Sequence, residues 1–125
     1  MTQNEVIRNL FVGDDFYNEE EFNLVIDLRE WDAERTFMEG DYQYIAGIIY
    51  TMNNLISEGK ILVHCHGGMD RSPFVVALYL HIYKKIPPIE AYELVKKRRP
   101  ETIIHDDWMN NYLQWVARAI DADME

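Results

Sequence analysis

One short run of the sequence combines a nucleophile with an anion-binding side chain. Cys65 is the only cysteine in the chain, and five residues separate it from Arg71, which Ser72 follows. A cysteine thiolate is a strong nucleophile, and the planar fork of an arginine can bind two oxygens of one phosphate group. Backbone N–H groups in a glycine-containing loop ahead of a helix form a nest for anions. These residue types therefore indicate attack of a thiolate on a bound phosphate, with a covalent phosphocysteine as intermediate.

Each position of the loop has an expected role in that chemistry. Cys65 is the candidate nucleophile, Arg71 the candidate catalytic phosphate ligand, and the Ser72 hydroxyl can donate a hydrogen bond to the sulfur and ease its departure. Glycine permits positive φ angles and close backbone approach, which an inward-facing nest requires. The candidate substrate-binding residues are therefore the whole run after the cysteine, namely His66, Gly67, Gly68, Met69, Asp70 and Arg71.

Taken one by one, these residues have ordinary explanations. A lone cysteine after an apolar run is usually a core residue, a Gly-Gly pair is usually a turn, and an arginine at a helix start is usually a surface residue. Their occurrence together at one spacing, between a strand and a helix start, favours a phosphate loop. Metal catalysis is not expected, because His64-Cys65-His66 at one strand end cannot supply convergent ligands. We therefore expect no cofactor.

Hydrophobic patterns predict the elements that position this loop. Residues 60–64 form an apolar run typical of a core strand, and residues 72–80 are apolar on every side, as in a helix buried at the domain centre. Ser72 suits the N-cap of that helix and Pro73 its first position. The remaining elements are predicted as strands over 6–12 and 24–28, and as helices over 41–57 with Gly59 as C-terminal cap, over 89–98, and from Asp106 or Asp107 through Ile120.

The alternation of strands and helices indicates an α/β fold with a central, mostly parallel sheet flanked by helices. We expect a single domain over residues 1–125, because no repeat or linker divides the chain. In such sheets ligands bind beyond the carboxyl ends of the strands. The cysteine loop lies at such an end.

The net charge and composition of the chain disfavour several classes of function. A formal net charge of −10 disfavours nucleic acid or an anionic membrane as the partner, and no apolar run approaches the roughly 20 residues of a membrane helix. The single cysteine and the polar start Met1-Thr2-Gln3-Asn4 predict a reducing cytoplasm and no signal peptide. The oligomeric state stays open.

The run His-Cys, five residues, Arg-Ser resembles the signature of the protein tyrosine phosphatase superfamily, and its details resemble the dual-specificity branch. The similarity extends along most of the chain, through Asn9–Gly13 at the opening strand, Ser72-Pro73 at the central helix, Glu90–Pro100 in a helix ending in Arg-Pro, and Trp108–Trp115 in the final helix. The resemblance implies a compact dual-specificity phosphatase-like domain. Its expected substrates are a phosphorylated protein or a small aryl phosphate, with phosphotyrosine preferred over phosphoserine and phosphothreonine.

The resemblance also implies a general acid on a loop before the nucleophile. Asp32 lies 33 residues before Cys65, and Trp31-Asp32 is similar to the Trp-Pro-Asp of the family's closing loop. Asp32 could instead cap the helix that follows it. Asp70 is the rival for the acid role, because an aspartate at that place also occurs in myotubularin-like phosphatases. Asp41 is a distant third and is better interpreted as the N-cap of its helix.

The sequence leaves other functions open, and it differs from the pattern of the similar family at several residues. A catalytically weak or inactive phosphate-binding module would keep the loop without a working acid, and a phosphatase of phosphoinositides or other small phosphates is a further alternative. Arsenate reductases usually need additional cysteines, and rhodanese-like loops do not usually combine this spacing with a Ser-Pro helix. We expect His64 to support the loop by hydrogen bonds to its backbone, and His66 and His105 to be surface residues. His105-Asp106 stands where relatives usually have Pro-Asn, and the helix dipole alone explains Arg98 and Arg99.

Overall fold

The computed structural model describes residues 3–31 and 39–123. In that part of the chain the elements are β1 (Gln3–Ile7), β2 (Leu10–Gly13), a 3₁₀ turn η1 (Glu19–Glu21), β3 (Leu24–Asp27), α1 (Glu39–Leu55), β4 (Ile61–His64), α2 (Arg71–Lys84), α3 (Pro88–Arg98) and α4 (Asp106–Asp123). The α/β prediction is confirmed. No helix in the described ranges is long and apolar enough to cross a bilayer.

The sheet has the order β1-β2-β4-β3, in which β2, β4 and β3 are parallel and β1 pairs with β2 in the antiparallel sense. Every residue of β4 is buried, which explains its unbroken apolar sequence. At the carboxyl edge, His64 is in register with Gly13 on one side and with Asp27 on the other. The loop that begins at Cys65 therefore leaves the sheet between the ends of two neighbouring strands.

The single strand predicted over residues 6–12 is wrong, because the chain forms a hairpin there. β1 and β2 are joined at Arg8-Asn9, and Asn9 has a φ of 70°. Asparagine tolerates this left-handed conformation better than most residues. The Asn9 side-chain amide also donates to the Ile56 carbonyl at 3.0 Å, which holds the turn against the end of α1. No glycine marks the turn, so the apolar residues on its two sides were assigned to one strand.

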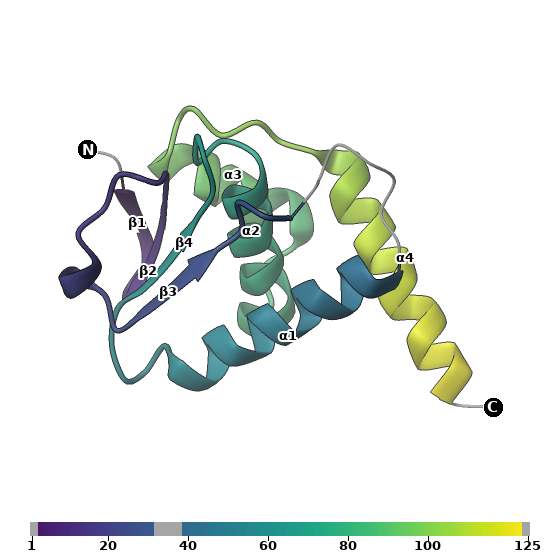
Figure 1. Cartoon of the computed structure of the whole chain (residues 1–125). Coiled ribbons are helices and arrows are strands. Elements are labelled where there is room, and N and C mark those ends of the chain that lie inside the picture. The colour runs from purple at the N-terminus through teal and green to yellow at the C-terminus, as the bar shows by residue number, and fades with distance from the viewer. Residues whose placement is uncertain (1–2, 32–38, 124–125) are drawn as a thin grey trace.

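The central position predicted for the helix after the loop is confirmed. Residues 72–80 of α2 are all buried, and α2 contacts β2, β4, α1, α3 and α4 (Figure 1). The predicted cap is wrong, however, because Arg71 begins the helix and Asp70 occupies the N-cap position. Ser72 lies inside the first turn, where its hydroxyl is used by the loop instead of by the helix end. α2 therefore joins the loop of residues 65–70 to the core, and this loop is called the phosphate loop after the ligand that the sequence predicts for it.

Two predicted helix boundaries on α1 also need correction. Asp41 is the third residue of α1 and is buried, so it does not cap the helix. Gly59 has no positive φ and is not a left-handed cap. Glycine is required at 59 by a close approach, since a Cβ there would lie 2.1 Å from Asn23 Oδ1, which accepts from the Lys60 N–H. The apolar face of α1 is as predicted, with Tyr42, Ile45, Ile49 and Met52 buried.

The last helix extends beyond the body of the domain. α4 begins beside α2 and its C-terminal half reaches away from the sheet (Figure 1). Tyr112, in the first half, is buried, whereas Ile120 is 55% exposed. The apolar residues of α4 therefore pack against the core only as far as Val116.

Candidate active site

The Cys65 sulfur lies at the N-terminus of α2. Its Sγ is 3.2 Å from the Ser72 hydroxyl and accepts the Ser72 backbone N–H at 3.4 Å. The Ser72 hydroxyl is also within 3.3 Å of the Gly13 carbonyl, which accepts the Cys65 N–H at 3.4 Å. The end of β2, the end of β4 and the first turn of α2 thus converge on one sulfur atom, which is only 2% exposed.

Gly68 shapes the loop more strictly than Gly67. It has a φ of 66°, and a Cβ there would lie 2.7 Å from the Gly13 carbonyl oxygen and 2.5 Å from Arg99 Nη2. A Cβ at Gly67 would meet only the end of the Met69 side chain, at 3.3 Å. A positive φ and a close backbone approach together require glycine at position 68.

Arg99 holds the outer side of the loop, a role that the sequence interpretation missed. Its Nε donates to the Gly68 carbonyl at 2.6 Å and its Nη2 to the Gly67 carbonyl at 3.1 Å, while Nη1 donates to Asn4 Oδ1 at 2.8 Å. In a trans peptide the C=O and the following N–H point in opposite directions. The N–H groups of Gly68 and Met69 therefore point away from Arg99. The only sequence signal was the Arg-Pro that ends the similar helix of relatives.

Arg71 fastens the turn after β3 to the phosphate loop. One guanidinium nitrogen, Nη1, donates to the carbonyls of Leu28, Arg29 and Trp31, at 3.2, 3.0 and 2.8 Å. Asp32, the sequence-predicted acid, is the next residue and lies outside the described residues. The chain is thus held beside the loop as far as Trp31.

The three remaining loop side chains differ in their surroundings. His66 is exposed, as expected, with Nδ1 3.4 Å from Asp15 Oδ2. Met69 is 38% exposed, and its carbonyl accepts the Ile103 N–H at 2.8 Å. Asp70 makes no cap hydrogen bond to α2, and its Oδ1 lies 2.7 Å from His105 Nε2.

His105 is consequently not a plain surface residue, and that expectation is wrong. Besides its contact with Asp70, its ring stacks on Trp108 with centroids 3.7 Å apart and planes 7° apart. Its carbonyl accepts the Met109 N–H at 3.2 Å, which places it immediately ahead of α4. A side-chain contact from the start of α4 to the loop is thus made by a histidine, at the place where relatives usually have Pro-Asn.

His64 does not hydrogen-bond to the loop, contrary to expectation. Its side chain is fully buried, and neither ring nitrogen has a hydrogen-bond partner among the described residues. The ring packs against Tyr17 at 4.7 Å, and Nε2 is 3.9 Å from Asp27 Oδ1. Burial lowers the pKa of His64. Asp27 itself accepts two hydrogen bonds from Arg29 Nε and Nη2, which lower its pKa to about 2.

The described residues contain no group of three or more His, Cys, Asp or Glu side chains that could hold a metal ion. The geometry does bring together the Cys65 sulfur, the N-terminus of α2, which Arg71 begins, and a loop whose carbonyls are held by Arg99. A model of the "Dual specificity phosphatase, catalytic domain" family matches residues 17–118, which is most of the chain. The chain belongs to the dual specificity phosphatase family.

Individual members of this family show how far the similarity reaches. "Dual specificity protein phosphatase 5" of Rattus norvegicus is 39% identical over 62 residues, which are 50% of this chain and 16% of that protein. The matched segment is thus a small part of that relative's length. The crystal structure of human DUSP28 has a TM-score of 0.74 at 19% identity and covers 97% of this chain and 96% of that chain. "Tk-PTP in the active form" has a TM-score of 0.71 at 19% identity and covers 90% of this chain. Both structures share the fold of this chain.

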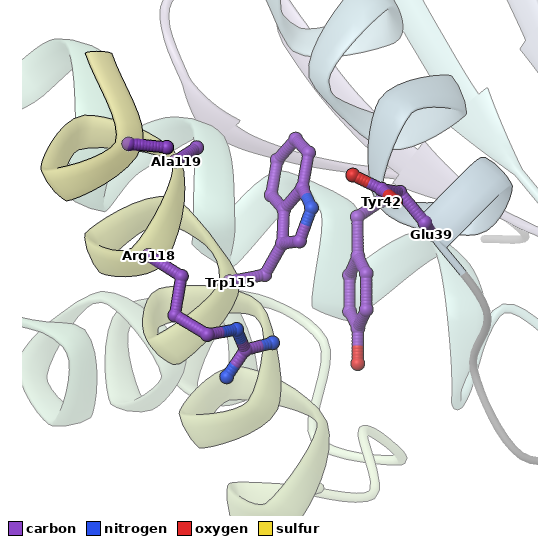
Figure 2. A pocket seen from close by; sticks show the side chains of 6 residues that line it. Glu39, Tyr42, Trp115, Arg118 and Ala119 are labelled. Atoms are coloured by element: carbon purple, nitrogen blue, oxygen red, sulfur yellow. The ribbon is translucent and has the colours of Figure 1, made fainter. Parts of the chain in front are cut away.

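A cavity of about 430 Å³ lies apart from the phosphate loop, between the start of α1 and the end of α4 (Figure 2). Its aromatic wall consists of Tyr42 and Trp115, whose rings stack at 5.5 Å with 19° between planes. Glu39, Arg118, Ala119 and Ala122 complete the lining. None of these residues belongs to the loop that holds Cys65.

Proposed function

We propose that the chain hydrolyses phosphate monoesters through a phosphocysteine at Cys65. The observation that carries the proposal is the position of the Cys65 sulfur, 3.2 Å from the Ser72 hydroxyl and 3.4 Å from its N–H. The N-terminus of α2 and the arginine that begins this helix attract phosphate oxygens toward the sulfur. Membership of the dual specificity phosphatase family supports the same reaction.

The proposed reaction has two steps. In the first, the sulfur lone pair forms a bond to phosphorus, and the phosphorus–oxygen bond to the leaving group breaks with its electron pair going to that oxygen, which takes a proton from an acid. In the second, water attacks phosphorus and gives a proton to the now deprotonated acid, and the sulfur–phosphorus bond breaks with its electron pair going to the sulfur, to which Ser72 donates a hydrogen bond. The inward N–H groups of the loop and Arg71 stabilise the charge on the equatorial oxygens in both transition states.

The nucleophile is tested by Cys65→Ser. Turnover of an aryl phosphate should fall below a few per cent of the unaltered enzyme, because a serine hydroxyl is a far weaker nucleophile than a thiolate at neutral pH. Binding of tungstate, a phosphate-like oxyanion, should persist because the loop and Arg71 are unchanged. Rapid-quench trapping of a phosphoenzyme from the unaltered chain completes the test. Substantial turnover by Cys65→Ser would contradict the covalent route.

We propose Asp32 as the general acid, with Asp70 as its rival. The support for Asp32 is its place directly after Trp31, whose carbonyl is tied to Arg71. A general acid matters most for leaving groups of high pKa. Asp32→Asn should therefore slow phosphotyrosine hydrolysis far more than hydrolysis of a nitrophenyl phosphate. If Asp70→Asn shows this dependence and Asp32→Asn does not, the role moves to Asp70.

The proposed substrates are phosphotyrosine and aryl phosphates, with phosphoserine and phosphothreonine accepted more slowly. The loop contains no lysine and carries the acidic Asp70, which disfavours polyanionic phosphoinositides. The single cysteine also supports a reducing compartment such as the cytoplasm as the working location. Phosphate release measured at matched concentrations of phosphotyrosine, phosphothreonine and phosphoinositide ranks the classes. Faster release from the phosphoinositide would overturn the ranking, and no release from any of them would favour a phosphate-binding module.

A further inference from the structure

The carboxylate of Asp70, in the phosphate loop, contacts His105, which lies just ahead of α4. Asp70 precedes Arg71 directly and occupies the N-cap position of α2. An aspartate at such a position ordinarily accepts a hydrogen bond from the first turn of its own helix. Here the side chain makes no such bond, and Oδ1 instead lies 2.7 Å from His105 Nε2 at the start of α4.

His105 is itself held firmly on two sides. Its ring stacks on Trp108 with planes only 7° apart, and Trp108 packs edge-on against Phe74 of α2 at 5.6 Å. The chain just before His105 is tied to the phosphate loop, since the Ile103 N–H donates to the Met69 carbonyl at 2.8 Å. The histidine nitrogen is therefore presented to Asp70 by a rigid support and not by a free surface side chain.

We propose that His105 is a positioning residue that holds the Asp70 carboxylate toward α4 and thereby preserves the affinity of the loop for the phosphate dianion. The proposal rests on the proposed function, because it concerns the same anion site. A carboxylate released from His105 would lie beside Arg71, where it would compete with phosphate for the guanidinium and repel the dianion.

A double-mutant cycle separates this role from a structural one. His105→Phe keeps a flat ring for the stack on Trp108 but removes the hydrogen-bond donor. It should raise the KM for an aryl phosphate and the Kd for tungstate about tenfold, with kcat changed less than threefold, because the Asp70 carboxylate loses the donor that holds it toward α4. His105→Gln keeps a donor at similar reach and should remain within threefold of the unaltered KM.

Asp70→Asn supplies the other arm of the cycle. If His105 acts by controlling the Asp70 charge, His105→Phe should have no further effect on KM or on tungstate Kd in the Asp70→Asn background. A full tenfold effect that persists in this background, or an unchanged KM in His105→Phe alone, overturns the proposal. A thermal unfolding curve of each variant checks that all the proteins compared are folded at the assay temperature. The chain could bind tungstate, with Kd values that follow the cycle as stated, and yet hydrolyse no ester. In that case the proposed hydrolysis fails while this inference stands.

Discussion

Replacement of Arg99 by methionine is a direct test of how the phosphate loop keeps its shape. Arg99 is 2% exposed and donates to the Gly67 and Gly68 carbonyls at 3.1 and 2.6 Å. Methionine retains most of the volume of the arginine stem and none of its donors. The substitution therefore removes the hydrogen bonds while leaving the packing nearly filled.

The size of the effect follows from these contacts. Leaving the buried Gly68 carbonyl and the partly buried Gly67 carbonyl without a donor costs about 1–3 kcal/mol each, with the smaller cost at Gly67. The carboxylates of Asp14 and Glu101, at 3.9 and 3.7 Å from the guanidinium, also lose a partner. We therefore expect a loss of about 3 kcal/mol in the free energy of unfolding, which lowers Tm by about 10 °C in a domain of this size.

Activity should fall by more than folding alone explains. Without Arg99 the peptide planes at Gly67 and Gly68 can rotate, and the N–H groups that face the phosphate lose their fixed direction. Removing one preorganised donor in other enzymes costs about 100-fold or more in turnover, so kcat/KM at a temperature well below Tm should drop at least tenfold. The assays are urea unfolding followed by tryptophan fluorescence and steady-state hydrolysis of an aryl phosphate.

Arg98 provides the matched control. It is the exposed neighbour at the end of α3, and Arg98→Met should change stability by no more than about 0.5 kcal/mol. Equal stability and equal kcat/KM for the two methionine variants would refute the reasoning. The loop shape would then be set by Gly68 and the contacts to β2 alone.

Three further predictions concern single groups. Gly68→Ala should strongly lower both Tm and aryl phosphate turnover, because Gly68 has a φ of 66° and lies close to the Gly13 carbonyl. Gly67→Ala should be tolerated, and a larger loss at Gly67 than at Gly68 would contradict the loop geometry. Burial raises the pKa of Tyr112 to about 12, above its usual 10, so stability should decline as pH rises above 10, and Tyr112→Phe should weaken that decline in urea titrations. Burial lowers the pKa of His64 below its usual 6.5, so stability should decrease as pH falls below 6.5; a His64→Phe variant with the same slope would refute this assignment.

The sequence alone predicted the elements whose pattern of apolar residues has a single physical explanation. The buried strand β4, the all-round apolar α2 and the parallel sheet are confirmed because each depends only on burial and chain order. The hairpin at Arg8-Asn9 was missed, because an asparagine in the left-handed region leaves no glycine signal and apolar residues stand on both sides of the turn.

Within the site, local spacing predicted the loop, and long-range partners were missed. The approach of Cys65 to Ser72 depends on one strand–loop–helix unit, so the motif was enough to indicate it. The contact of Arg99 with Gly68 joins the end of α3 to the loop, and that of His105 with Asp70 joins the start of α4 to it. Such pairings depend on how α3 and α4 pack, which no periodicity in the chain specifies.

The position of the sole thiol gives this chain an internal probe of its own site. Cys65 is 2% exposed, and the groups around its sulfur come from β2, β4 and α2. A small alkylating reagent would reach the sulfur by the same path as a phosphate ester, so bound tungstate should slow the labelling. Because the chain has a single cysteine, each labelled molecule carries one thiol adduct. One mass-spectrometric time course would thus measure the occupancy of the loop at the atom on which catalysis is proposed to depend.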